Sequence, residues 1–195
     1  MTITERLDAA IGEHRLLDHP FYRSWREGTL PVAALRTYAA EYGAFVGAID
    51  AGWETVGERD HAAEERIHAG LWNRFAGHLG AEVATPQVPE VVAMLATARR
   101  LFTQPASAWG ALYAFEAQQP ATSEEKLKGL SDHYGIARDH PAAEYFRVHA
   151  ADYREADQIT DALAASPRVD VAVSACAEMA EALWSALSGI HDRHC

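Results

Sequence analysis

Apolar residues recur at helical spacing along almost the whole chain. The clearest example is the segment from Pro31 to Gly57, whose apolar positions are Leu35, Tyr38, Ala39, Tyr42, Phe45, Val46 and Ile49. This spacing places the side chains on one face of a helix that begins near Pro31 and ends near Gly57. No segment shows the strict alternation of a half-buried strand. The pattern therefore predicts an all-α fold.

The same reading divides the rest of the chain into helices separated by Pro, Gly and short polar segments. The expected helices are Ile3–His14, Pro20–Glu27, Pro31–Gly57, Ala62–Leu79, Glu90–Phe102, Ala106–Gln118, Ser123–Tyr134, Asp139–Leu163 and Val169–His191. Ser123 is the expected N-cap of its helix. Because the connections are short, we expect residues 1–195 to form one domain, a single compact bundle of about seven to nine helices.

Composition and charge narrow the classes of partner. The 195 residues are 49% hydrophobic and 23% charged, which is typical of a globular protein. Lys and Arg number 17 against 28 Asp and Glu, giving a net charge of −11 and no basic stripe, so nucleic acid is not an expected partner. The charged N-terminal stretch is unlike a signal peptide, no apolar run approaches a membrane span, and two cysteines make no disulfide framework. We expect a cytoplasmic protein with no membrane partner.

One carboxylate stands out among apolar neighbours. Glu116 follows Leu112, Tyr113 and Phe115 on an expected core helix, and Lys126 comes ten residues later. A buried carboxylate is costly unless a cation pairs with it, so the pair suggests chemistry. The alternative is a solvated Glu and a solvated Lys on either side of a helix break.

A second helix carries a pair of the kind that binds metal. Glu65 and His68 are three residues apart, and Glu64 and His68 are four apart, so either pair shares a helix face. A Glu-x-x-His pair on one helix is typical of di-iron carboxylate bundles. The same pair also occurs by chance on solvated helices.

A third helix carries His149, Asp152 and Glu155 at steps of three residues. Imidazole and carboxylate ligands suit iron or manganese. Taken alone, the row is also compatible with a solvated face, since Arg147 and Arg154 are near. Together, the three helices could bring their ligand-type residues to one point inside a bundle.

The sequence also resembles a known superfamily along nearly its whole length. The resemblance is carried by the segments Leu17–Trp25, Gly28–Leu30, Tyr38–Tyr42, His68–Gly80, Tyr113–Gly135, Tyr145–His149 and Ala182–Ile190. They are similar to the heme-oxygenase-like helical fold shared by the thiaminase II (TenA), PqqC and CADD families. The segment from Tyr113 to Lys126 most resembles the CADD-like iron-containing redox enzymes. Thiaminase chemistry is not expected, because Ala108–Glu116 contains no Cys.

The resemblance implies roles for particular residues. Glu116, His149 and His68 match metal-ligand positions of the family. Tyr22 matches a tyrosine that in CADD lies near the metal and is consumed in making para-aminobenzoate. Lys126 matches a lysine needed in the same chemistry.

The sequence also departs from the family pattern. The family's last ligand helix has His, then Asp four residues on, then His three further, where this chain has Tyr153 and Ala156. A one-residue deletion would restore Asp152 to the Asp position and put Glu155 in place of the second His. A Glu that the family carries before the position of His68 must be replaced here, and the candidates are Glu58, Glu64 and Glu65, with His61 also nearby.

These observations predict a metal-dependent oxidase or oxygenase acting on a small organic molecule, with one or two irons as cofactor and dioxygen as co-substrate. The expected metal ligands are Glu65, His68, Glu116, His149 and Asp152, and the expected catalytic residues are Tyr22 and Lys126. One alternative is a cofactorless oxidase similar to PqqC, for which Tyr153 and Arg154 leave room. Another is a metal-free member that only binds a ligand. Because members of these families often dimerise, a homodimer is also expected.

Overall fold

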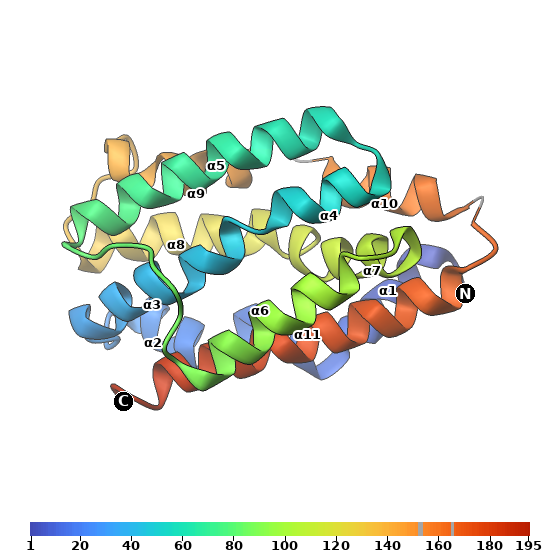
Figure 1. The fold of residues 1–195 in the computed structure, drawn as a ribbon. Helices are drawn as coiled ribbons and strands as arrows, with labels where there is room; N and C mark the ends of the chain where they lie inside the picture. The colour runs from blue at the N-terminus through green and yellow to red at the C-terminus, as the bar shows by residue number, and fades with distance from the viewer. Residues whose placement is uncertain (152–153, 165) are drawn as a thin grey trace.

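The fold is helical throughout the part of the chain that the structure, a computed structural model, describes: residues 1–151, 154–164 and 166–195. These residues form eleven α-helices and three short 3₁₀ helices, and no strand occurs among them (Figure 1). The predicted all-α fold class is confirmed. The helix count exceeds the expected seven to nine because two of the expected helices are each divided.

Short segments connect most of the helices. The α-helices are α1 (Ile3–Ile11), α2 (Pro20–Glu27), α3 (Val32–Val46), α4 (Ile49–Val56), α5 (Arg59–His78), α6 (Pro89–Leu101), α7 (Pro105–Glu116), α8 (Gln119–His133), α9 (Glu144–Ala150), α10 (Glu155–Ala164) and α11 (Val169–His191). The 3₁₀ helices are η1 (Gly12–His14), η2 (Leu16–Asp18) and η3 (Pro141–Ala143).

The expected helix from Pro31 to Gly57 is two helices, and the break falls at Gly47 and Ala48. Gly47 is the C-cap of α3, and its N–H donates to the carbonyl of Gly43 at 2.9 Å. Glycine has a low helix propensity, so a break costs least at this position. Apolar periodicity continues across the break, which is why the pattern alone predicted one helix.

Two further boundaries differ from the expectation. The segment predicted as one helix from Asp139 to Leu163 contains η3, α9 and α10, and α9 ends at Ala150. Helix α8 begins at Gln119 with a proline in its first turn, so Ser123 is not an N-cap. Instead Ser123 is buried inside α8, and its hydroxyl donates to Oε1 of Gln119 at 3.3 Å.

One cluster of buried hydrophobic side chains extends through the bundle from Leu7 to Ile190. Helices α5 and α11 run along opposite sides of the molecule, with α4, α7 and α8 between them (Figure 1). The long α11 packs against α6 and α7. At Gly110 the approach is so close that a Cβ atom would lie 1.9 Å from the carbonyl oxygen of Ala172. Most of the buried polar residues stand on α5, α7, α8 and α9, whereas buried His19 contacts Ser188 of α11.

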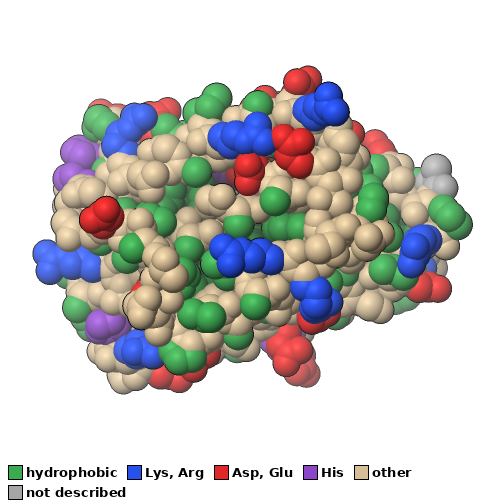
Figure 2. Space-filling view, viewed as in Figure 1, with side chains coloured by type: hydrophobic (Ala, Val, Ile, Leu, Met, Phe, Trp, Pro, Cys, Tyr) green, Lys and Arg blue, Asp and Glu red, His purple; other side chains and the backbone are tan. Residues whose placement is uncertain are grey.

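The visible surface mixes charges of both signs. Figure 2 shows acidic and basic side chains next to one another, and Arg66 on α5 pairs with both Asp50 and Glu54 on α4. Within the described residues, none of the helices combines the length and the apolar character needed to cross a bilayer.

Candidate metal centre

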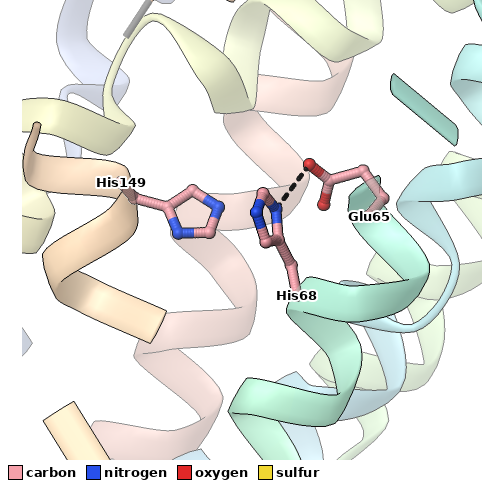
Figure 3. A group of neighbouring side chains, drawn as sticks. All are labelled: Glu65, His68 and His149. Carbon is pink, nitrogen blue, oxygen red and sulfur yellow. Dashed lines mark hydrogen bonds and ion pairs between the residues drawn. The ribbon is translucent and has the colours of Figure 1, made fainter. Parts of the chain in front are cut away.

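Three ligand-type side chains from two helices meet inside the bundle. Glu65 and His68 come from α5 and His149 from α9, and each offers one ligand atom within 4.8 Å of the others (Figure 3). The spacing of three residues puts Glu65 and His68 on the same face of α5. Glu64 points elsewhere, since 59% of its side chain is exposed against 5% for Glu65. The inward pair is therefore the Glu-x-x-His pair that the sequence indicated.

His68 and Glu65 form a hydrogen-bonded pair. Nδ1 of His68 lies 3.0 Å from Oε1 of Glu65. Burial is the largest single influence on the pKa of His68 and lowers it. The hydrogen bond to Glu65 and the charges of nearby glutamates, Glu65 first, together outweigh burial, so the net shift is upward. When Nδ1 carries the proton toward Glu65, Nε2 keeps the ring's lone pair and can bind a metal.

His149 is prepared as a neutral ligand. The side chain is fully buried, and Nδ1 lies 2.6 Å from the carbonyl oxygen of Tyr145. Because a carbonyl only accepts, Nδ1 carries the proton and Nε2 the lone pair, which is the usual arrangement of a metal-binding histidine. Burial and then the nearby His68 lower the pKa of His149 to about 3, so the ring is neutral at physiological pH.

The surroundings of one buried carboxylate oxygen show whether this site fits a metal. Oε2 of Glu65 is buried, and no hydrogen-bond donor within the described part of the chain reaches it. Leaving a charged acceptor in this state costs about 1–3 kcal/mol or more, which a bound cation would offset. Two imidazoles and one carboxylate are suitable ligands for iron, manganese or zinc. The residues present therefore fit the predicted metal.

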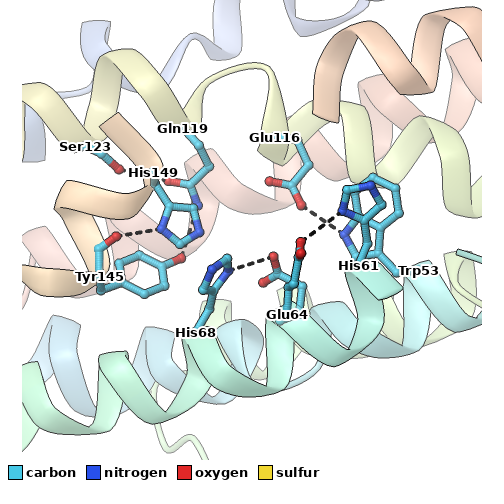
Figure 4. A network of polar contacts seen from close by, with 10 residues as sticks. Trp53, His61, Glu64, His68, Glu116, Gln119, Ser123, Tyr145 and His149 are labelled. Carbon is cyan, nitrogen blue, oxygen red and sulfur yellow. Dashed lines mark hydrogen bonds and ion pairs between the residues drawn. The ribbon is translucent and has the colours of Figure 1, made fainter. Parts of the chain in front are cut away.

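Glu116 lies beside this group rather than within it. The side chain is fully buried at the C-terminal end of α7, and Nε1 of Trp53 donates to its Oε1 at 3.3 Å (Figure 4). Burial raises the pKa of Tyr145, and the charges of Glu65 and then Glu116 raise it further. Both carboxylates therefore act on the same interior region.

The remaining candidates from the sequence are placed differently. Glu64 pairs with His61 at 3.4 Å on the exposed side, and His61 stacks on Trp53 with its Nε2 at 2.5 Å from Oε1 of Gln158. Glu58 is the residue that precedes α5. Asp152 lies outside the described residues, as does Tyr153, and Arg154 is exposed.

Glu155 at the start of α10 is half-buried and also belongs near the site. Its Oε2 is buried without a hydrogen-bond partner in the described structure. Burial raises the pKa of Glu155, and Glu65 adds to the rise whereas His61 opposes it. Glu155 in turn contributes to the raised pKa of His68. These mutual effects place Glu155 within electrostatic range of the ligand group.

Lys126 and Tyr22 occupy the neighbouring part of the interior. Nζ of Lys126 lies over three aromatic rings, at centroid distances of 5.2 Å for Tyr22, 5.7 Å for Tyr38 and 5.4 Å for Phe146. Burial lowers the pKa of Lys126 to about 7, so a large share of the amine is neutral at physiological pH. Burial raises the pKa of the Tyr22 phenol, which stays protonated.

Two residues to which the sequence analysis gave no role support the site. Tyr145 stacks on His149 with ring centroids 4.1 Å apart, and its hydroxyl accepts a hydrogen bond from Nε2 of Gln119 at 3.2 Å. The spacing of four residues between Tyr145 and His149 is a signal that they share a helix face. Gln119 carries no such signal, because it meets Tyr145 only through the packing of α8 on α9.

Comparison with known proteins agrees with this architecture. Residues 32–185 match the model of a family described as iron-containing redox enzymes. The curated relatives include 4-aminobenzoate synthases of Nitrosomonas europaea (31% identical, covering 100% of this chain and 93% of the relative) and Chlamydia pneumoniae (31% identical, covering 94% and 92%).

The solved structures that this fold resembles are heme-oxygenase-like. A TenA homologue from Pseudomonas syringae has a TM-score of 0.76 at 17% identity over 96% of this chain and 90% of its own. A heme-oxygenase-like domain from Shewanella denitrificans has a TM-score of 0.75 at 15% identity over 98% and 89%. The predicted resemblance is thus confirmed in both sequence and fold, and the chain belongs to the iron-containing redox enzyme family.

Proposed function

We propose that the protein is a non-heme iron oxidase or oxygenase that acts on a small organic molecule and uses dioxygen. The observation that carries this proposal is the group of Glu65, His68 and His149. It contains two imidazoles that can bind a metal in their neutral form, and a buried carboxylate oxygen that no donor of the described residues reaches. Membership of a family of iron-containing redox enzymes favours iron over zinc or manganese. Iron held there would supply the one-electron steps that dioxygen chemistry requires.

The surrounding side chains have separate tasks in this proposal. Glu65, His68 and His149 would hold the first iron, and Glu116 and Glu155 would complete its surroundings or help to hold a second. The carbonyl of Tyr145 fixes the tautomer of His149, which orients its Nε2. Asp152, the remaining predicted ligand, lies outside the described residues and stays a prediction from the sequence.

We further propose 4-aminobenzoate as the product, as the names of the curated relatives suggest. Such a product consists of an aromatic ring that carries an amino group and a carboxylate, and the amine of Lys126, at Nζ, lies 5.2 Å from the centre of the Tyr22 ring. With a pKa of about 7, the Lys126 amine is available in its neutral form, which can accept a proton or act as a nucleophile.

The metal is tested first. Metal-free protein is loaded with Fe(II) without oxygen, its iron content is measured, and dioxygen uptake is then followed. We expect at least one iron per chain in the wild type and a large loss of iron in His149→Ala and His68→Ala. His78→Ala, at the end of α5 and exposed, is the matched control and keeps its iron. Sub-stoichiometric iron in the wild type would defeat the proposal.

The product is tested separately by mass spectrometry after dioxygen is added to the iron-loaded protein. We expect 4-aminobenzoate from the wild type and none from Tyr22→Phe or Lys126→Met, with the iron content of both variants unchanged. If turnover survives a strong chelator, the cofactorless alternative replaces the iron proposal. If iron binds but another product forms, the oxidase proposal stands and the product assignment fails.

A further inference from the structure

A cavity of about 390 Å³ opens at the surface, and none of the proposed metal ligands lines it, nor does Tyr22 or Lys126. It lies between α1, the turns that follow it, and the junction of α7 with α8, where Ala117, Gln118, Ala121 and Thr122 form one wall. Small-molecule sites in proteins begin at about this volume, roughly 300 Å³.

Hydrogen bonds from side chains fix the walls of this cavity. Oε1 of Gln118 accepts from the N–H of Leu16 at 2.8 Å, and its Nε2 donates to the carbonyl of Ala114 at 2.8 Å. Asp8 of α1, which also lines the cavity, is held by the hydroxyl of Tyr113 on α7, which donates to Oδ1 of Asp8 at 2.8 Å. The cavity is therefore formed before any ligand arrives, which reduces the entropy cost of binding.

The inner wall of the cavity is shared with the proposed site. Thr122 lines the cavity, yet only 2% of the residue is exposed. Burial dominates the raised pKa of Tyr22, and Thr122 acts on the Tyr22 hydroxyl in the opposite direction, as a hydrogen-bonding neighbour does. Thr122 thus contacts both the cavity and Tyr22, and one side chain separates the two.

The lining combines charged and apolar side chains, and its Arg15 and Asp18 belong to the same turn. Arg15 offers a guanidinium for a carboxylate and Asp18 an acceptor for an amino group, while Ile11, Leu17 and Ala121 provide apolar surface. We propose that this cavity binds a small aromatic carboxylate that also carries an amino group. The choice of ligand rests on the proposed function, whereas the cavity and its walls do not.

Ligand binding is tested on metal-free protein, so that the result is independent of iron. Nuclear magnetic resonance titration with 4-aminobenzoate, benzoate and aniline should shift the amide signals of Ala117 and Ala121. We expect Arg15→Gln to weaken 4-aminobenzoate and benzoate by about tenfold and leave aniline unchanged, because only the first two carry a carboxylate. Arg59→Gln, on the exposed start of α5, is the matched control and should bind like the wild type.

A variant whose cavity is filled by a larger side chain provides the second test. Ala121 is exposed at the rim, so Ala121→Trp should fold normally and abolish binding of all three probes. If no probe shifts the cavity signals in the wild type, or if Ala121→Trp binds as the wild type does, the inference is overturned. Because iron loading is measured in a separate sample, a failure here leaves the iron proposal standing, and a failure of iron loading leaves this result intact.

Discussion

The amine of Lys126 is buried over three aromatic rings, and this environment determines its protonation state. Removal from water lowers its pKa from the ordinary value of 10.5 to about 7. The folded state therefore binds fewer protons than the unfolded state between these two values, and stability must rise with pH across that window. Below about pH 7 the full cost of burying the charged amine is present. The same feature that costs stability makes a neutral amine available to the site.

Replacing Lys126 by Met removes this pH dependence. The stability advantage of Lys126→Met over the wild type should shrink by about 2 kcal/mol between pH 7 and pH 9, because the wild type gains stability as its amine loses the proton. Urea unfolding at several pH values measures this difference. Lys128→Met, on the exposed face of α8, should show a constant difference across the range. A constant difference for Lys126→Met as well would mean that its amine titrates normally.

Trp53 has an equally local role beside Glu116. Its Nε1 donates to a fully buried carboxylate, so Trp53→Phe removes a charge-assisted hydrogen bond. We expect the free energy of unfolding to fall by about 1.5–3 kcal/mol. Trp109→Phe is the comparison, because Trp109 packs edge-on against Trp53 and has no part in this bond. Equal losses in the two variants would show that ring volume, rather than the donated hydrogen bond, determines the effect.

At the scale of helices, the packing of α7 on α11 depends on the absence of one side chain. A Cβ at Gly110 would lie 1.9 Å from the backbone oxygen of Ala172, and backbone cannot yield as a flexible side chain can. Gly110→Ala should therefore lower the free energy of unfolding by about 3 kcal/mol. Gly70→Ala in α5 is the matched control, since a Cβ there meets nothing within 4 Å. It should be neutral or stabilising by up to about 1 kcal/mol, because alanine is the better helix former.

The sequence predicted which segments are helical. It did not predict where several helices end or which side chains of different helices come into contact. Apolar periodicity runs unbroken through Gly47, and it does not show that α3 ends there. The Glu-x-x-His spacing identified His68 but left Glu64 and Glu65 equivalent, because either position can share the face of His68. The packing of α5 against α3, α4 and α9 turns Glu65 inward. Gln119, which supports Tyr145, depends on the same kind of long-range contact and gave no local signal.

At the scale of the whole molecule, the candidate ligands are brought together by folding. Glu65 and His68 stand on α5, and His149 follows about 80 residues later on α9. In an unfolded chain these groups are far apart, so an ion bound to all three favours the folded state. Metal binding and folding stability should therefore be coupled. Since the chain carries a net charge of −11, a divalent ion can also stabilise it without specific binding.

Thermal unfolding without oxygen separates the two effects. At Fe(II) concentrations near 100 times the dissociation constant, specific binding adds about 2.7 kcal/mol, which corresponds to a rise of about 5–10 °C in Tm. His149→Ala leaves the net charge unchanged, because the ring is neutral in the folded protein. It should abolish the rise caused by Fe(II), and Mg(II) should produce little rise in either protein, because imidazole is a poor ligand for magnesium. An equal rise in His149→Ala would show that the ion acts on surface carboxylates, and the assigned group would then not be the iron site.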